Sequence, residues 1–172
     1  MKRKNDQLKT ERLVLKPYDP SDQPQMVAIL CNESIKKTFM IPDFSDQQQA
    51  VELFERLMEF SKSSDHFEYG IYWNGTLIGF VNDCGMNQTT IEIGYVIHPD
   101  YQGKGFATEA VSACIQELFR MGYKHIHAAF FSGNTASQRI MEKCGMHKLD
   151  CEGDLEYQGI LQHVFYYGID KR

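Results

Sequence analysis

The sequence predicts a single mixed α/β (α+β) domain in which helices cover both faces of one central, mostly antiparallel sheet. Residues 67–73 and 76–82 alternate between two faces, and Asn74-Gly75 between them favours the tight turn of a β-hairpin. A third alternating run at residues 91–97 follows a polar turn, which extends the hairpin to an antiparallel meander. A helical segment and another strand come next, and this order is typical of a right-handed parallel crossover.

The other elements follow from helical periodicity and capping residues. Ser45 and Gln48 have the spacing of a capping box in front of an amphipathic helix, and Gly122 stands where a glycine commonly ends a helix. Asn134 is a suitable N-cap for a short helix that ends near Lys143. The remaining segments are expected to be a strand at 10–15, a helix at 22–30, an irregular stretch at 32–44, and strands at 124–131, 147–155 and 162–169.

Length and composition indicate one globular domain spanning residues 1–172. Hydrophobic residues make up 42% and charged residues 24% of the chain, which is ordinary for a globular protein. The net charge of −5 argues against nucleic acid as a partner, because phosphate backbones are bound by clustered Lys and Arg. No apolar run follows the basic residues 2–4, so we expect no signal peptide and no membrane anchor. The five cysteines form no CxxC pair, which predicts reduced thiols in a cytoplasmic protein and no zinc site.

The segment 102–107, Gln-Gly-Lys-Gly-Phe-Ala, leads from the third strand of the meander into a helix. Such a loop directs backbone N–H groups and the positive end of a helix dipole to one point, which predicts an anion site. A P-loop requires Ser or Thr after its lysine, whereas Gly105 follows Lys104. A dinucleotide-binding loop requires a third glycine, whereas Thr108 stands in its place. The segment does match Gln/Arg-x-x-Gly-x-Gly/Ala, the pattern of acetyl-coenzyme A loops, at every defined position.

Three ordered segments resemble the GNAT superfamily of N-acetyltransferases, and within it the branch of ribosomal-protein N-terminal (alanine/serine) acetyltransferases. These segments are residues 10–15 (TERLVL), residues 93–105 (IGYVIHPDYQGKG) and residues 134–146 (NTASQRIMEKCGM). The resemblance implies a GNAT fold whose sheet contains a splayed strand pair. It also implies acetyl-CoA as co-substrate, no metal, and transfer of an acetyl group to a primary amine. A homodimer is expected because dimers are common in this branch.

The resemblance also implies which residues bind acetyl-CoA. The strand before the loop would offer main-chain contacts to the pantetheine arm from Tyr95, Val96 and Ile97. Asn134 matches the asparagine that hydrogen-bonds this arm, although asparagine is equally preferred as a plain N-cap. The pyrophosphate would lie on the amides of Gln102, Gly103, Lys104, Gly105, Phe106, Ala107 and Thr108. The Lys104 side chain either lies near phosphate or is a solvated loop lysine.

The chemistry requires a base, because α-amino groups titrate near ~8 and lysine near ~10.4. Glu92 is the first candidate, on the opposite strand face from Ile91 and Ile93, and its alternative role is that of a solvent-facing strand residue. A backbone N–H such as that of Val96 would stabilise the oxyanion. Ser137 matches the serine that the branch uses to protonate the leaving thiolate and also binds the cofactor, and its alternative role is a second capping hydroxyl.

The acceptor is expected to be a protein or peptide N-terminus or a small amine. Five aromatic residues are candidates for the lining of its pocket: Phe39, Phe44, Tyr157, Tyr166 and Tyr167. A module that binds acyl-CoA without turnover, as a sensor or regulatory partner, is the alternative. Because Glu92 and Ser137 are both present, the sequence favours the enzyme.

Overall fold

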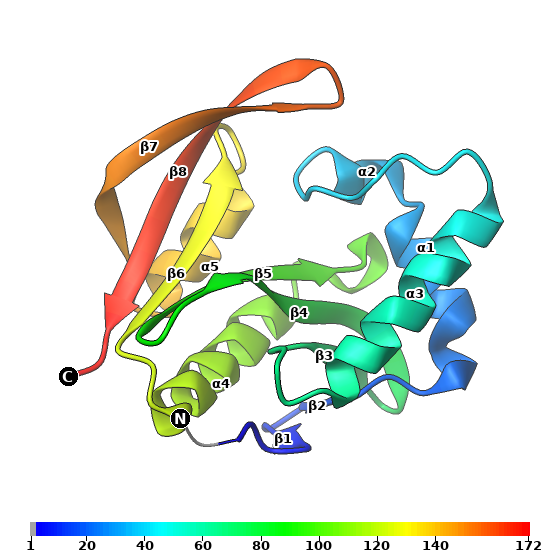
Figure 1. The fold of residues 1–172 in the computed structure, drawn as a ribbon, viewed down its shortest axis with the longest axis horizontal. Helices are drawn as coiled ribbons and strands as arrows, with labels where there is room; N and C mark the ends of the chain where they lie inside the picture. Colours follow the sequence, from blue (N-terminus) through cyan, green and yellow to red (C-terminus); the bar gives the residue numbers. More distant parts are fainter. Residues whose placement is uncertain (1–2) are drawn as a thin grey trace.

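The computed structural model describes residues 3–172, which form one open sheet with helices on both faces (Figure 1). The eight strands lie in the order β1-β2-β3-β4-β5-β6-β8-β7, and β5 and β6 are the parallel pair among antiparallel neighbours. This arrangement confirms the mostly antiparallel mixed sheet and the parallel crossover. The strands span Leu8–Lys9 (β1), Leu13–Lys16 (β2), Tyr69–Trp73 (β3), Thr76–Met86 (β4), Thr90–Ile97 (β5), His125–Phe131 (β6), His147–Tyr157 (β7) and Ile160–Asp170 (β8).

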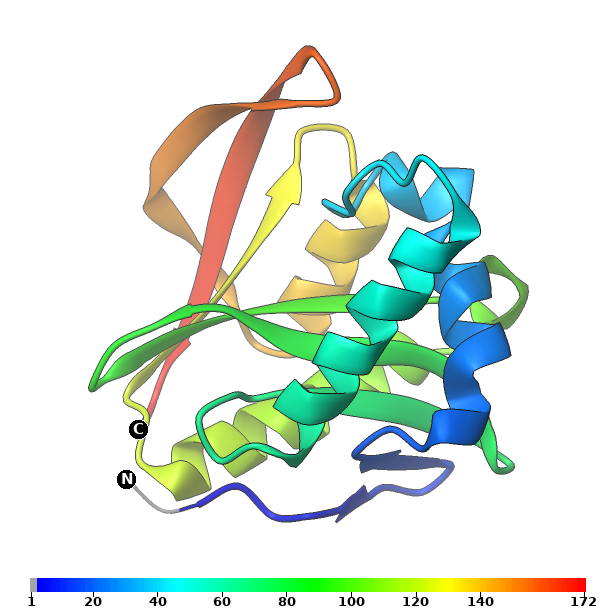
Figure 2. The same cartoon turned by 45° about the vertical axis from the view of Figure 1, so that its right-hand side comes forward.

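Helices from the first third of the chain cover one face of the sheet, and those from the second half cover the other (Figures 1 and 2). The first face carries Gln23–Leu30 (α1), Glu33–Lys36 (α2) and Gln47–Lys62 (α3), and the second carries Phe106–Met121 (α4) and Thr135–Lys143 (α5). Each face has its own cluster of buried apolar side chains, so two cores sandwich the sheet.

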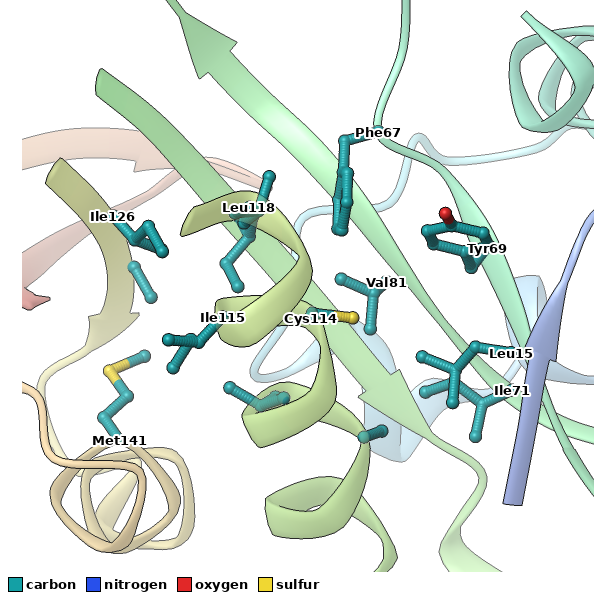
Figure 3. Packing of buried hydrophobic residues seen from close by; sticks show 14 of the residues in the cluster. Leu15, Phe67, Tyr69, Ile71, Val81, Cys114, Ile115, Leu118, Ile126 and Met141 are labelled. Carbon is teal, nitrogen blue, oxygen red and sulfur yellow. The ribbon is translucent and has the colours of Figure 1, made fainter. Parts of the chain in front are cut away.

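Helix α4 supplies the centre of the larger core (Figure 3). Cys114 and Leu118 on its inner side are fully buried, and they face Val81 of β4 and Ile126 of β6. Burial of one such leucine contributes about 1.5–3 kcal/mol. The apolar stripe therefore holds α4, and with it the loop at its N-terminus, firmly against the strands.

Several element boundaries differ from those expected from the sequence. Helix α2 lies inside the stretch expected to be irregular, because the Asn32 side chain accepts hydrogen bonds from the N–H groups of Ser34 and Ile35 and caps a single helical turn. Asp46, one residue after the expected cap, accepts from Gln49 N at the start of α3. Strand β4 continues past residue 82, because a β-bulge at 83–85 preserves its pairing with β5.

The pairing of β5 with β6 is short. The parallel register covers Thr90↔His125, Ile91↔Ile126 and Glu92↔His127, and it ends there. From that point β6 stays paired with β8 while β5 stays paired with β4, so the two strands diverge (Figure 1). The splayed strand pair is thereby confirmed, and it leaves one backbone edge of β5 without a partner strand from Ile93 onward.

Arg12 braces the loop between β5 and α4 from outside. Its guanidinium forms an ion pair with Glu109 (Nε–Oε2 2.7 Å), donates to the Lys104 carbonyl at 2.8 Å, and lies 4.6 Å from the centre of the Phe106 ring. Thr10 adds a hydrogen bond to Glu109 at 2.5 Å. The N-terminal segment therefore fixes the first turn of α4 and the loop before it.

We predict that Arg12→Ala loosens this loop without unfolding the domain. Loss of hydrogen bonds of ~1 kcal/mol each should raise amide hydrogen exchange at residues 103–106 by roughly three- to tenfold. The matched control is Arg120→Ala, which removes an ion pair with Glu117 at the opposite end of α4. Equal exchange in the loop of both variants would show that Arg12 is not the brace.

Glu68, directly before β3, forms part of a buried polar cluster. Tyr18 donates its hydroxyl proton to the Glu68 carboxyl group, and Lys4 donates to the Glu68 backbone carbonyl at 3.3 Å. Glu68 is 2% exposed, and burial raises the pKa of its carboxyl group to about 8. Folded Glu68 therefore retains a proton at pH values where the unfolded chain has released it.

We predict that Glu68→Gln flattens the pH dependence of stability. Because the folded pKa is about 8 and the unfolded value is 4.5, Glu68 lowers the free energy of unfolding as pH rises through this window. The glutamine variant should gain on the order of 1–3 kcal/mol over wild type at pH 9 and little at pH 4. Urea unfolding at both pH values measures this, with the exposed Glu59→Gln as control. A wild-type stability that does not fall across the window would contradict the assignment.

Candidate functional site

A cleft of about 540 Å³ opens where β5 and β6 diverge, and it crosses the sheet. On one face it is lined by Ser34, Ile35, Thr38 and Phe39 in and after α2, and on the other by the glycine loop and α5. The cleft is therefore a passage between the two faces of the sheet, and the predicted cofactor-binding residues surround part of it. Among the predicted site residues, those that line it are Tyr95, Val96, Ile97, Gln102, Gly103, Gly105, Phe106, Ala107, Thr108, Asn134 and Ser137.

The glycine loop is shaped by two residues with positive φ. Gly103 has φ +74° and Gly105 has φ +81°, a region that glycine occupies without the steric cost of a Cβ. Gly105 is the N-cap of α4 and has no side chain to cap the helix, so the first N–H groups of α4 lack a side-chain acceptor. Gln102 turns back and donates its side-chain N–H to Ile97 O at 2.8 Å. The arrangement offers N–H donors and a helix dipole to an anion.

Lys104 points away from this cleft. Its ammonium donates to Asp100 O at 3.2 Å and lies 5.8 Å from the Trp73 ring centre and 5.6 Å from that of Tyr101. Two other cations, Arg139 and Lys143 on α5, do line the cleft. They are four residues apart, which places them on one side of the helix, and this spacing is the signal by which the sequence could have indicated them.

The unpaired edge of β5 carries the backbone groups of alternate residues. His98 N donates to Ile78 O across β4 and β5, and the antiparallel alternation then directs Val96 N–H toward β4 as well. The groups that face the divergence are those of Ile93, Tyr95 and Ile97. The expected oxyanion donor at Val96 does not fit this register, because its N–H belongs to the β4 ladder.

Asn134 and Ser137 lie together at the start of α5. The Asn134 carboxamide accepts from Ser137 N at 3.2 Å and donates to Ser137 Oγ at 3.1 Å, so Asn134 is an N-cap and a cleft residue at once. Tyr95 donates its hydroxyl proton to Ser137 O at 3.2 Å and joins β5 to α5. Because Ser137 Oγ already accepts from Asn134, its own proton is free for donation into the cleft.

Glu92 lies on the opposite face of the sheet from the loop, beside the point where β5 and β6 part. Burial raises the pKa of its carboxyl group. Among residues 3–172 no hydrogen bond or ion pair reaches this carboxylate. It lies outside the set that lines the cleft, two positions before Gly94, which lines it. Burial, and then the charge of Glu92, raise the pKa of Tyr166 on β8, which marks the tyrosine as a neighbour.

The aromatic residues expected at an acceptor pocket separate into different places. Phe39 lines the cleft. The Tyr157 hydroxyl hydrogen-bonds Phe39 O and Ile41 O, each at 3.2 Å, and ties the tip of the β7–β8 hairpin to the segment after α2. Tyr167 belongs instead to the core on the α4 face, where its neighbours include Phe130, and Phe44 packs beside α1 and α3.

In the described part of the chain, no helix is long and apolar enough to cross a membrane. Residues 3–172 also contain no group of three or more His, Cys, Asp and Glu side chains placed to hold a metal ion.

Known proteins share this architecture. The protein is 26% identical to the uncharacterized N-acetyltransferase YoaA of Bacillus subtilis (strain 168) over 92% of its own chain and 88% of that protein. Its fold matches that of the microcin C7 self-immunity acetyltransferase MccE, solved with acetyl-CoA and AMP, with a TM-score of 0.82, 19% identity and coverage of 94% of each chain. The ribosomal L7/L12 alpha-N-protein acetyltransferase RimL, solved with coenzyme A, gives a TM-score of 0.81, 16% identity and coverage of 94% and 95%.

The family model described as "Acetyltransferase (GNAT) domain" matches residues 12–147, which include the glycine loop, both diverging strands and the helix that carries Ser137. The chain therefore belongs to the GNAT acetyltransferase family, and it is an acyltransferase.

Proposed function

We propose that this protein transfers an acetyl group from acetyl-CoA to a primary amine by direct attack in a ternary complex. The observation that carries the proposal is the cleft through the sheet, which has an anion-binding loop on one face and lies beside the unpaired, half-buried carboxylate of Glu92 on the other. The complexes of MccE with acetyl-CoA and of RimL with coenzyme A support this choice of donor.

The chain fits acetyl-CoA through groups that lack partners of their own. The N–H groups of the loop and of the first turn of α4 suit a pyrophosphate, and Arg139 and Lys143 add positive charge. The free edge of β5 suits the amide groups of a pantetheine arm, which would add to the sheet as an extra strand. Asn134 keeps one carboxamide lone pair beyond its cap, so capping and binding are compatible.

The proposed reaction needs three groups around the thioester. Glu92 takes a proton from the amine, directly or through a water, as the amine nitrogen bonds the acetyl carbon. The N–H groups of the β5 edge at Tyr95 and Ile97, in place of Val96, donate to the oxyanion. Ser137 supplies a proton to the sulfur when the carbon–sulfur bond breaks, and the serine oxygen takes a proton back from water.

The acceptor in this proposal is the amine of a peptide or protein N-terminus, or of a small molecule. RimL, which is named for acetylation of a ribosomal protein, supports a protein acceptor. The excess of acidic residues is compatible with a cationic acceptor. The proposal includes a cytoplasmic location, which the pattern of cysteines indicates, and a homodimer, which the family resemblance implies.

We predict that the protein releases free thiol from acetyl-CoA with a panel of primary amines, and that Glu92→Gln removes most of this activity. Loss of a general base typically lowers turnover by about 10²–10⁴-fold. Because burial raises the pKa of Glu92, the rate of wild type should rise with pH through a limb above the ordinary range of a glutamate. The glutamine variant should lack that limb, whereas Glu59→Gln should keep it. Tight binding of coenzyme A without thiol release for any amine would favour a non-catalytic sensor.

We predict that Ser137→Ala lowers turnover by roughly 10–100-fold while the dissociation constant of coenzyme A changes little. The backbone N–H that Asn134 caps is retained in this variant, so α5 should stay intact. Stopped-flow kinetics and calorimetric titration measure the two effects. The control is Ser112→Ala, because Ser112 contacts Cys144 outside the cleft. A weakened affinity for coenzyme A with unchanged turnover would assign Ser137 to binding alone.

A further inference from the structure

Asn82 of β4 presents a polar atom that the fold itself does not use. Its side-chain oxygen is the buried side-chain polar atom that has no hydrogen-bond partner among residues 3–172, whereas its side-chain N–H donates to Asp83 O at 3.2 Å. A buried acceptor without a donor costs free energy, and such groups are rare in folded proteins. Where one persists beside a cleft, a ligand is a natural source of the missing donor.

The position of this oxygen ties it to the proposed reaction centre. Asn82 pairs with Gly94 on β5, and a side chain at position 94 would meet Asn82 Oδ1 at 2.9 Å. Gly94 lines the cleft and lies two residues from Glu92, on the same face of β5. Two groups that only accept hydrogen bonds, the Asn82 oxygen and the Glu92 carboxylate, therefore sit on adjacent strands and lack donors.

The geometry points to Asn82 as the residue that recognises the acceptor, and this inference rests on the function proposed above. A neutral primary amine carries two N–H bonds and one lone pair. Glu92 takes the hydrogen that leaves, and the Asn82 oxygen holds the hydrogen that stays on the amide nitrogen of the product. The lone pair then points at the acetyl carbon. The substrate class that follows is a primary amine, because a secondary amine has no second N–H for Asn82.

Phe39 controls access to this oxygen. Its ring edge also reaches to 2.9 Å of a side chain built at position 94, and it packs against Phe80 at a ring distance of 5.6 Å. Phe39 lies between α2 and α3, in a segment with no helix or strand. An amine that enters from the α2 face displaces this ring from Gly94 and takes its place above Asn82.

The test compares a primary amine with its N-methyl analogue in wild type, Asn82→Leu and Asn82→Asp. Wild type should prefer the primary amine by tenfold or more in kcat/KM. Asn82→Leu, which keeps the volume and removes the oxygen, should raise the KM for the primary amine about tenfold and remove the preference. Asn82→Asp, which keeps an oxygen acceptor, should retain it. In Asn82→Leu the dissociation constant of coenzyme A should not rise and the thermal midpoint should not fall, since an unsatisfied polar atom has been removed.

An equal preference in wild type and Asn82→Leu would overturn the inference while leaving the transferase function intact. A fall of the midpoint in Asn82→Leu with kinetics lowered for both amines alike would also overturn it, because the role of Asn82 would then be structural. A wild type that acetylates no amine, and whose midpoint no amine raises in the presence of coenzyme A, would overturn the function and the inference together.

Discussion

The site depends on one constraint, namely that β5 and β6 cannot remain paired. Strand β6 is held to β8 along its whole length from His125 to Phe131, and β5 is held to β4 as far as Ile97. The parallel pairing between them covers three residues and then ends. Buried backbone groups are almost always paired, so an edge in the middle of a sheet is costly unless something else occupies it. In the proposed complex, a co-substrate arm with its own amide groups would satisfy that edge, and the cost of parting the strands would become a source of binding energy.

Polar groups near the cleft contrast with those elsewhere in the protein. Away from the cleft, buried acids have donors: Tyr18 for Glu68, Tyr72 for Asp22, and Arg120 for Glu117. The two tyrosine–acid pairs connect segments that lie far apart in the chain, and the Arg120–Glu117 pair lies within α4. Beside the cleft, the Glu92 carboxylate and the Asn82 oxygen have no such donor in the described residues. Buried polar groups without hydrogen-bond partners are expected where a protein keeps those groups available for a ligand.

The sequence was sufficient for most of the fold, and most of the residues that it predicted for the donor side line one cleft. Each of these features has a signature in a short stretch of sequence. Positive φ angles require glycine at 103 and 105, helix capping favours Asn134, and a two-residue turn marks the hairpin of the meander. Helix α2 was missed because a four-residue helix has no periodicity to detect. The role proposed for Asn82 could not be predicted because it depends on the register of β4 against β5, and the same register directs the Val96 N–H toward β4. Register describes how two separate strands pair, so it cannot be predicted from the sequence of one strand alone.

The donor side of the proposed site was easier to predict from the sequence than the acceptor side, and this difference has a physical origin. The loop, the β5 edge and the first turn of α4 offer mainly backbone groups, which exist at every residue, so few side chains are needed to specify a site for the donor. The acceptor side, as proposed, is formed by side chains from separate elements: Phe39 after α2, Asn82 on β4, Glu92 on β5 and Tyr166 on β8. The hydrogen bonds from Tyr157 set where the segment after α2 lies relative to the hairpin. Under this proposal, changes at any of these positions would alter which amine enters while the backbone at the donor side stays the same. A fold of this kind can therefore keep one donor and exchange its acceptors, which is why the acceptor has to be inferred from individual side chains and not from the motif.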